Sequence, residues 1–90
     1  MENVFVNFDW VGGFTSAITA SCTIKGGPPE IKGRTIIFAT EKKLAKALAG
    51  VGVPEHEYVG TINTLKSGFT TFLWLTLEQA QQLQMIERVE

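Results

Sequence analysis

The chain has 90 residues, of which 44% are hydrophobic and 19% are charged, and its eight basic and nine acidic residues give a formal net charge of -1. This composition excludes the charge-rich, aromatic-poor class of disordered chains, and the length predicts one compact domain over residues 1–90. Because the net charge is close to zero, no overall field draws the protein to nucleic acid or to an anionic membrane, and we expect neither as a partner.

The chain contains a single cysteine, Cys22, and a single histidine, His56. One cysteine excludes an intramolecular disulfide, and the two residues supply too few ligands for a structural zinc site within one chain. We therefore expect no metal and no cofactor. Since no basic segment precedes an apolar core and no apolar run approaches the roughly 20 residues of a membrane span, we expect a cytoplasmic protein without a signal peptide.

Two stretches near the amino end, residues 4–11 and 17–25, alternate between two faces in the period of two that is typical of strands. One face of these stretches carries Val4, Val6, Phe8 and Trp10, and then Ile18, Ala20, Cys22 and Ile24. The pattern predicts an antiparallel hairpin. Residues 26–30 contain two glycines and two prolines, which cannot continue a central strand and predict a loop.

A sequence pattern recurs at residues 35–41 and 71–77. In each copy one threonine opens a run of four apolar residues, a second threonine closes it, and a helical pattern begins. Nearly continuous apolar runs indicate burial on both faces, so residues 34–39 and 69–75 predict central strands. The repeat is either a duplication or two independent uses of the same strand-to-helix corner.

Thr40 is a good N-cap for a helix that ends near Gly50 or Gly52, and Thr76 with Gln79 makes a capping-box pattern for the last helix. The apolar stripe of that last helix comprises Leu77, Ala80, Leu83, Ile86 and Val89. Between the helices, residues 58–63 alternate in a way that predicts a further strand.

The predicted element order is therefore β-β-β-α-β-β-α. This order indicates a two-layer α+β domain, with a mixed sheet of about five strands and two helices on one of its faces.

Cys22 and His56 together suggest a thiolate and imidazole pair, which would make the protein an enzyme. Cys22 lies between Ala20 and Ile24 on the apolar face of a strand, where cysteine usually serves as an inert small hydrophobe. His56 follows Pro54 and is expected in a solvated loop. We therefore expect a non-enzymatic protein.

Lys25, Lys32 and Arg34 bracket the loop of glycines and prolines, where backbone amides could receive a phosphate or a carboxylate. The glycine spacing is not that of a phosphate-binding P-loop. These residues support an alternative function, a small-ligand or anion-binding domain.

Surplus apolar side chains around the first hairpin give the leading hypothesis. Trp10 and Phe14 flank the turn at Gly12, while Phe5 and Val11 lie on the face that should otherwise be polar. By contrast, Trp74 is expected in the core. Exposed aromatic residues often mark protein interfaces. We therefore predict a protein-interaction or self-assembling domain, a homo-oligomer and most simply a dimer, that uses the hairpin surface and its strand edge.

Overall fold

The computed structural model describes residues 2–11, 17–27 and 29–88. In chain order the elements are β1 (Glu2–Trp10), β2 (Ile18–Ile24), β3 (Ile31–Gly33), β4 (Thr35–Phe38), α1 (Glu41–Gly50), α2 (Glu55–Lys66), β5 (Thr71–Thr76), α3 (Leu77–Gln82) and β6 (Ile86–Arg88). Within the described residues no helix is both long enough and apolar enough to cross a membrane.

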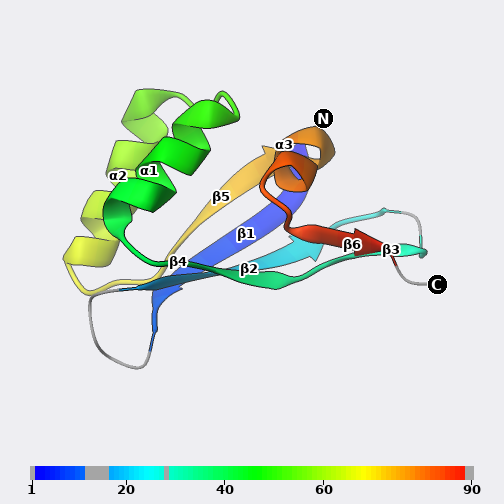
Figure 1. The fold of residues 1–90 in the computed structure, drawn as a ribbon, viewed down its shortest axis with the longest axis horizontal. Helices are drawn as coiled ribbons and strands as arrows, with labels where there is room; N and C mark the ends of the chain where they lie inside the picture. The colour runs from blue at the N-terminus through cyan, green and yellow to red at the C-terminus, as the bar shows by residue number, and fades with distance from the viewer. Residues whose placement is uncertain (1, 12–16, 28, 89–90) are drawn as a thin grey trace.

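The elements form a main sheet of four strands in the order β4-β2-β1-β5 and a separate ribbon of β3 with β6. Helices α1 and α2 lie side by side over one face of the main sheet, and α3 lies over one end of β1 and β5 (Figure 1). The predicted α+β class is confirmed. The predicted single mixed sheet is wrong, because every strand pair is antiparallel and the strands divide between two sheets.

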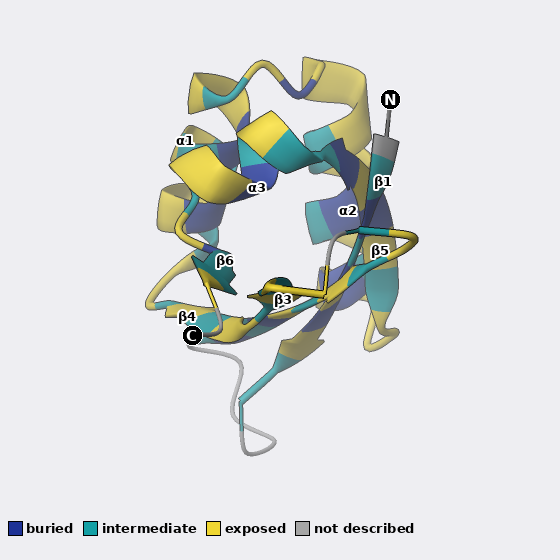
Figure 2. Ribbon diagram, turned by 90° about the vertical axis from the view of Figure 1, so that its right-hand side faces the viewer, coloured by how far each residue is buried: buried dark blue, intermediate teal, exposed yellow. Residues whose placement is uncertain are grey.

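The hairpin of β1 and β2 forms the centre of the sheet, as the alternation predicts, with Val4 opposite Ile24 and Trp10 opposite Ile18. Three inward residues of β1, Val4, Val6 and Phe8, are fully buried, and the fourth, Trp10, is partly buried against the core. Figure 2 shows the buried residues gathered between the helices and the sheet. The other fully buried core residues come from β2, β5, the three helices and the segment that follows α3, and they are Ile18, Ala20, Leu44, Leu48, Leu65, Leu75, Ala80 and Met85.

The two strands predicted to be central, β4 and β5, lie instead at the opposite edges of the main sheet. Ile37 of β4 is 63% exposed, and Phe72 and Trp74 of β5 are 54% and 41% exposed. Trp74 is therefore not a core residue. In both apolar runs only alternate residues face the helices, and the residues between them are apolar although they face outward.

Residues 58–63 lie in helix α2 and not in the predicted strand. Thr61 and Leu65 are buried on one face of this helix, with Tyr58 and Ile62 packed beside them, which is helical spacing. Burial of this stripe outweighs the alternation that predicted a strand, because tertiary packing routinely overrides local sequence preference. His56 consequently lies in the first turn of a helix, exposed to solvent.

The last helix is shorter than predicted. The capping box at Thr76 and Gln79 is present as expected, but α3 ends at Gln82 and Gln84 adopts a positive φ of 62°. The chain then reverses and residues Ile86–Arg88 form β6, which pairs with β3. Ile86 therefore belongs to a strand, and Val89 lies outside the described residues.

Only Arg34 separates β3 from β4. At this residue the chain passes from the ribbon, where β3 pairs with β6, to the main sheet, where β4 pairs with β2. The Arg34 N–H donates to the Met85 carbonyl (2.8 Å) and the Arg34 Nε donates to the Gln84 carbonyl (2.6 Å). Gly33 passes very close to β2, because an added Cβ would overlap the Cys22 carbonyl oxygen and lie 2.6 Å from its carbonyl carbon. Only glycine permits this approach.

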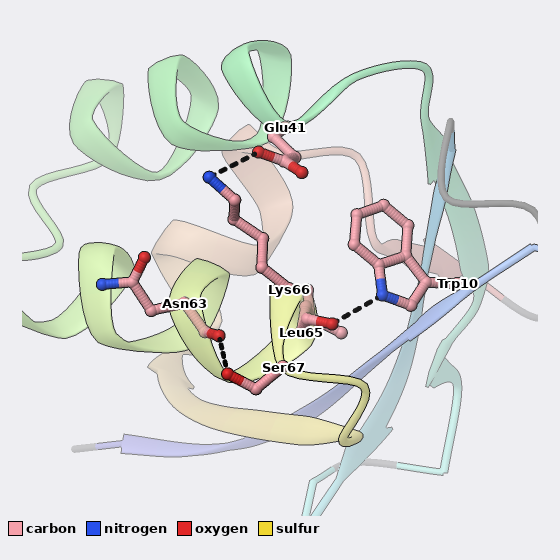
Figure 3. A network of polar contacts seen from close by, with 6 residues as sticks. All are labelled: Trp10, Glu41, Asn63, Leu65, Lys66 and Ser67. Carbon is pink, nitrogen blue, oxygen red and sulfur yellow. Dashed lines mark hydrogen bonds and ion pairs between the residues drawn. The ribbon is translucent and has the colours of Figure 1, made fainter.

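Helix α2 is fastened to the sheet by Trp10. The Trp10 indole packs against the core and its Nε1–H donates to the Leu65 carbonyl (2.7 Å), near the carboxyl end of α2 (Figure 3). Next to this contact, Lys66 of α2 lies 3.8 Å from the Glu41 carboxylate at the start of α1. The indole is thus a second donor to the Leu65 carbonyl, which also accepts from the Gly68 N–H (3.0 Å), while its ring packs against the core.

Replacing Gly33 with alanine is expected to destabilise the fold by about 2 kcal/mol or more, because the new methyl group meets the β2 backbone, which cannot move aside without breaking strand pairing. Urea denaturation followed by circular dichroism measures the change. Gly60→Ala is the control: an added Cβ there meets nothing within 4 Å. That helical substitution should stabilise the protein by about 0.5–1 kcal/mol. Equal effects of the two variants would contradict the close approach.

Replacing Trp10 with phenylalanine should cost about 1 kcal/mol, because the Leu65 carbonyl loses a partly buried hydrogen bond while most of the apolar ring remains. Trp74→Phe is the matched control, since Trp74 is 41% exposed. It should change stability by less than about 0.5 kcal/mol. Denaturation midpoints of the two variants provide the comparison, and a larger loss for Trp74→Phe would contradict a stabilising Trp10–Leu65 hydrogen bond.

Candidate protein-interaction surface

Three aromatic side chains form a cluster on the face of the main sheet that the helices leave open. Phe5 of β1 stacks on Phe72 of β5 with ring centroids 5.2 Å apart and an angle of 27° between the ring planes. The Phe5 ring also meets Trp74 edge to face, with centroids 5.1 Å apart and an angle of 67°. Both arrangements are favourable aromatic geometries. We call Phe5, Phe72 and Trp74 the aromatic cluster.

The register of β1 and β5 explains why these rings meet. Phe5 lies opposite Trp74, and its neighbour two residues along, Asn7, lies opposite Phe72. Residues directly opposite one another share a face of the sheet, so Phe5 touches one ring directly and the other diagonally. Leu73 and Leu75 of the same strand point to the opposite face and are buried under the helices.

The rest of the open face is polar except at its far edge. The β2 side chains on this face carry hydroxyl groups, and the Ser21 hydroxyl lies 3.2 Å from that of Thr35 in β4. Beyond them, Ile37 projects from the β4 edge and is 63% exposed. Among the described side chains, the alternation assigns only Asp9 and Lys25 as charged residues of this face. The aromatic cluster is therefore an apolar patch beside an uncharged polar strip.

The structure separates the four residues that the sequence proposed for partner binding. Phe5 belongs to the aromatic cluster, whereas Trp10 packs against the core and bonds to Leu65. Val11 is half-buried and its N–H donates to the Ala17 carbonyl (2.9 Å). Phe14 lies outside the described residues. Of these residues only Phe5 belongs to the aromatic cluster on the outer face, and the exposed rings beside it, Phe72 and Trp74, belong to β5.

The sequence reasoning missed Phe72 and Trp74. The signal that could have found them is the alternation of large aromatic and aliphatic residues in β5, together with a single aromatic residue at the outward position of β1. A phenylalanine on the outer face of one strand is shielded from water mainly by an apolar side chain on the same face of the neighbouring strand. Phe5 therefore predicts apolar residues on the outer face of the strand beside it.

The three cations of the alternative anion site have different surroundings. Lys32 forms an exposed ion pair with Glu87 of β6, with Nζ and Oε1 3.3 Å apart, and such a pair contributes little to stability. The Arg34 Nε donates to the Gln84 carbonyl, as described above. Lys25 is exposed at the end of β2, where its N–H donates to the Asn3 carbonyl. Two of the three side chains thus already have partners within the chain.

Cys22 is partly buried in β2, where the strand faces the β3 crossing, and burial raises the pKa of its thiol. A raised pKa favours the thiol over the nucleophilic thiolate at neutral pH. His56 is exposed in α2, and no hydrogen bond joins it to Cys22 in the described part of the chain. This geometry gives the thiolate and imidazole pair no support.

In the regions the structure describes, no three histidine, cysteine or acidic residues form a group that could hold a metal ion. Comparison with known proteins identifies no relative: no protein-family model, no curated protein and no solved structure matches the chain. The aromatic cluster on the open sheet face is accordingly the strongest candidate site.

Proposed function

We propose that this protein is a small non-enzymatic interaction domain whose open sheet face binds a protein surface through the aromatic cluster. The observation that carries the proposal is the exposure of two large rings, Phe72 and Trp74, on a face that the helices do not cover. Exposed, preassembled aromatic groups lose little conformational entropy on binding and bury a large apolar area, which makes them effective anchors of protein interfaces.

The charge of the open face favours protein over nucleic acid as the partner. Aromatic residues on an exposed sheet can stack with bases, but single-stranded nucleic acids also need a basic groove that follows the phosphates. Here Asp9 offsets Lys25, and the exposed lysines of α1, Lys42, Lys43 and Lys46, belong to the helical layer on the other side of the sheet. The face therefore offers stacking without phosphate neutralisation.

Selection of binders from a random peptide library displayed on phage tests this proposal without knowledge of the natural partner. Peptides that bind the immobilised native protein should be rich in apolar residues. They should bind the Phe72→Thr/Trp74→Thr variant with a Kd raised at least about tenfold, because removal of an aromatic anchor usually costs about 2 kcal/mol or more. Threonine suits a strand, so the sheet itself should persist.

Phe69→Thr is the matched control, because Phe69 is 67% exposed but lies before β5 and outside the aromatic cluster. Its Kd values should equal those of the native protein. Peptides that bind both variants equally well would show that the preferred binding surface lies elsewhere. Tight binding of a single-stranded oligonucleotide that the double variant loses would replace the proposal with nucleic-acid recognition by the same face.

A further inference from the structure

The outer edge of β5 carries backbone groups that no other described strand pairs with. Strand β5 lies at the end of the main sheet and is bonded on one side only, to β1. Each residue of an antiparallel strand directs its N–H and C=O groups to one side, and successive residues alternate between the two sides. It is therefore possible to determine which residues of β5 face the free edge.

Two hydrogen bonds at the ends of the hairpin settle this alternation. The Lys25 N–H donates to the Asn3 carbonyl, and the Val11 N–H donates to the Ala17 carbonyl. The odd-numbered residues of β1 thus bond to β2, and the even-numbered residues bond to β5.

Val4, Val6 and Phe8 pair on β5 with Leu75, Leu73 and Thr71, whereas Glu2, beyond the register shift, lies opposite Thr76. The remaining residues, Phe72 and Trp74, direct their backbone groups outward. The next outward position, Thr76, donates its N–H to Oε1 of Gln79 (2.9 Å) in the capping box, so the available edge ends there. The free edge therefore consists of one donor and one acceptor on each of Phe72 and Trp74.

This edge lacks the features that usually prevent strands from pairing between molecules. Natural edge strands are protected by lysine, proline, bulges or a covering element. Residues 71–76 contain no charged residue and no proline, and the register shift in the pairing with β5 falls on β1, between Glu2 and Val4. The two outward residues are also the exposed rings of the aromatic cluster.

We infer that two copies of this protein pair through the free edges of their β5 strands, antiparallel, with Phe72 of each copy opposite Trp74 of the other. The inference rests on the proposed function and names its partner as a second copy. In this register each pair of opposed residues exchanges two hydrogen bonds, and the two-fold axis makes two such pairs, so every free donor and acceptor of the edge is used.

Two physical features favour a second copy as the occupant. A two-fold axis brings equal residues close together, and an edge without charges incurs no repulsion there. The register also places a phenylalanine beside a tryptophan across the axis, a favourable cross-strand pair, and joins the two aromatic clusters into one continuous stripe. The arrangement is closed, because the interface is the same patch on both copies.

The opposite edge of the sheet, strand β4, is less suited to pairing with a second copy. By the same alternation, Thr35 and Ile37 of β4 direct their backbone groups outward. Self-pairing there would oppose threonine with isoleucine and would bring no aromatic contact. This edge provides an internal control within the native protein.

Sedimentation equilibrium and amide hydrogen exchange on the native protein test the inference. We expect a dimer that forms as protein concentration rises, with slower exchange of the Phe72 and Trp74 amides at high concentration and unchanged exchange at Thr35 and Ile37. A protein that remains monomeric at all concentrations overturns the inference, as does protection of the Thr35 and Ile37 amides in place of the β5 amides.

A pair of charge variants tests the register. Phe72→Glu/Trp74→Lys places opposite charges across the two-fold axis, whereas Phe5→Glu/Trp74→Lys has the same net charge but pairs its charges within one chain. The first variant should dimerise at least about tenfold more tightly at low salt, and high salt should reduce the difference.

Equal association of the two charge variants would overturn edge pairing. That result leaves the proposed function intact, because peptide selection tests the aromatic face independently of any dimer. If a variant fails to fold by circular dichroism, the amide exchange of the native protein decides the question.

Discussion

The structure depends on the one-sided covering of a four-stranded antiparallel sheet. Helices α1, α2 and α3 bury the inner residues of β1, β2 and β5, and the outer face is left to solvent. An antiparallel sheet with one solvated face usually carries polar residues on that face. Strand β2 follows this pattern with serine and threonine, whereas β1 and β5 depart from it, because Phe5, Phe72 and Trp74 lie on the outer face.

The helical layer is held in place by a small number of polar contacts to backbone carbonyls. Trp10 bonds to Leu65 at the end of α2, Gln79 bonds through Nε2 to the Val51 carbonyl after α1 (3.0 Å), and Arg34 bonds to the reversed chain after α3. Each contact adds a side-chain donor to a carbonyl at the end of a helix or in a turn, and the Leu65 carbonyl also accepts from the Gly68 N–H (3.0 Å). These three side chains therefore help to fix the position of the helix ends relative to the sheet.

Local signals in the sequence identified the hairpin of β1 and β2 and the two threonine N-caps, because alternation and capping depend on neighbouring residues alone. Helix α2 was missed because the helical conformation of this segment depends on the burial of Thr61 and Leu65 against strands that are distant in the sequence. Strand β6 was missed because the chain reverses direction at Gln84. This residue has a positive φ but is not glycine, so the sequence gives no turn signal there. Of the candidate site, only Phe5 was found, since an apolar run in β5 does not reveal which of its residues face outward.

The rings of the aromatic cluster contact one another within the chain, and the proposed association would use a different part of the same rings. Within the chain, stacking of Phe5 on Phe72 and its edge contact with Trp74 strengthen the pairing of β1 with β5. The ring surfaces turned away from these contacts give no further stability to the monomer, because they remain in water. The stability of the folded chain explains why aromatic residues lie opposite one another on β1 and β5. It does not explain why the free edge of β5 carries no charged residue. The combination of both features in one strand is what an association surface requires and what an isolated folded chain does not.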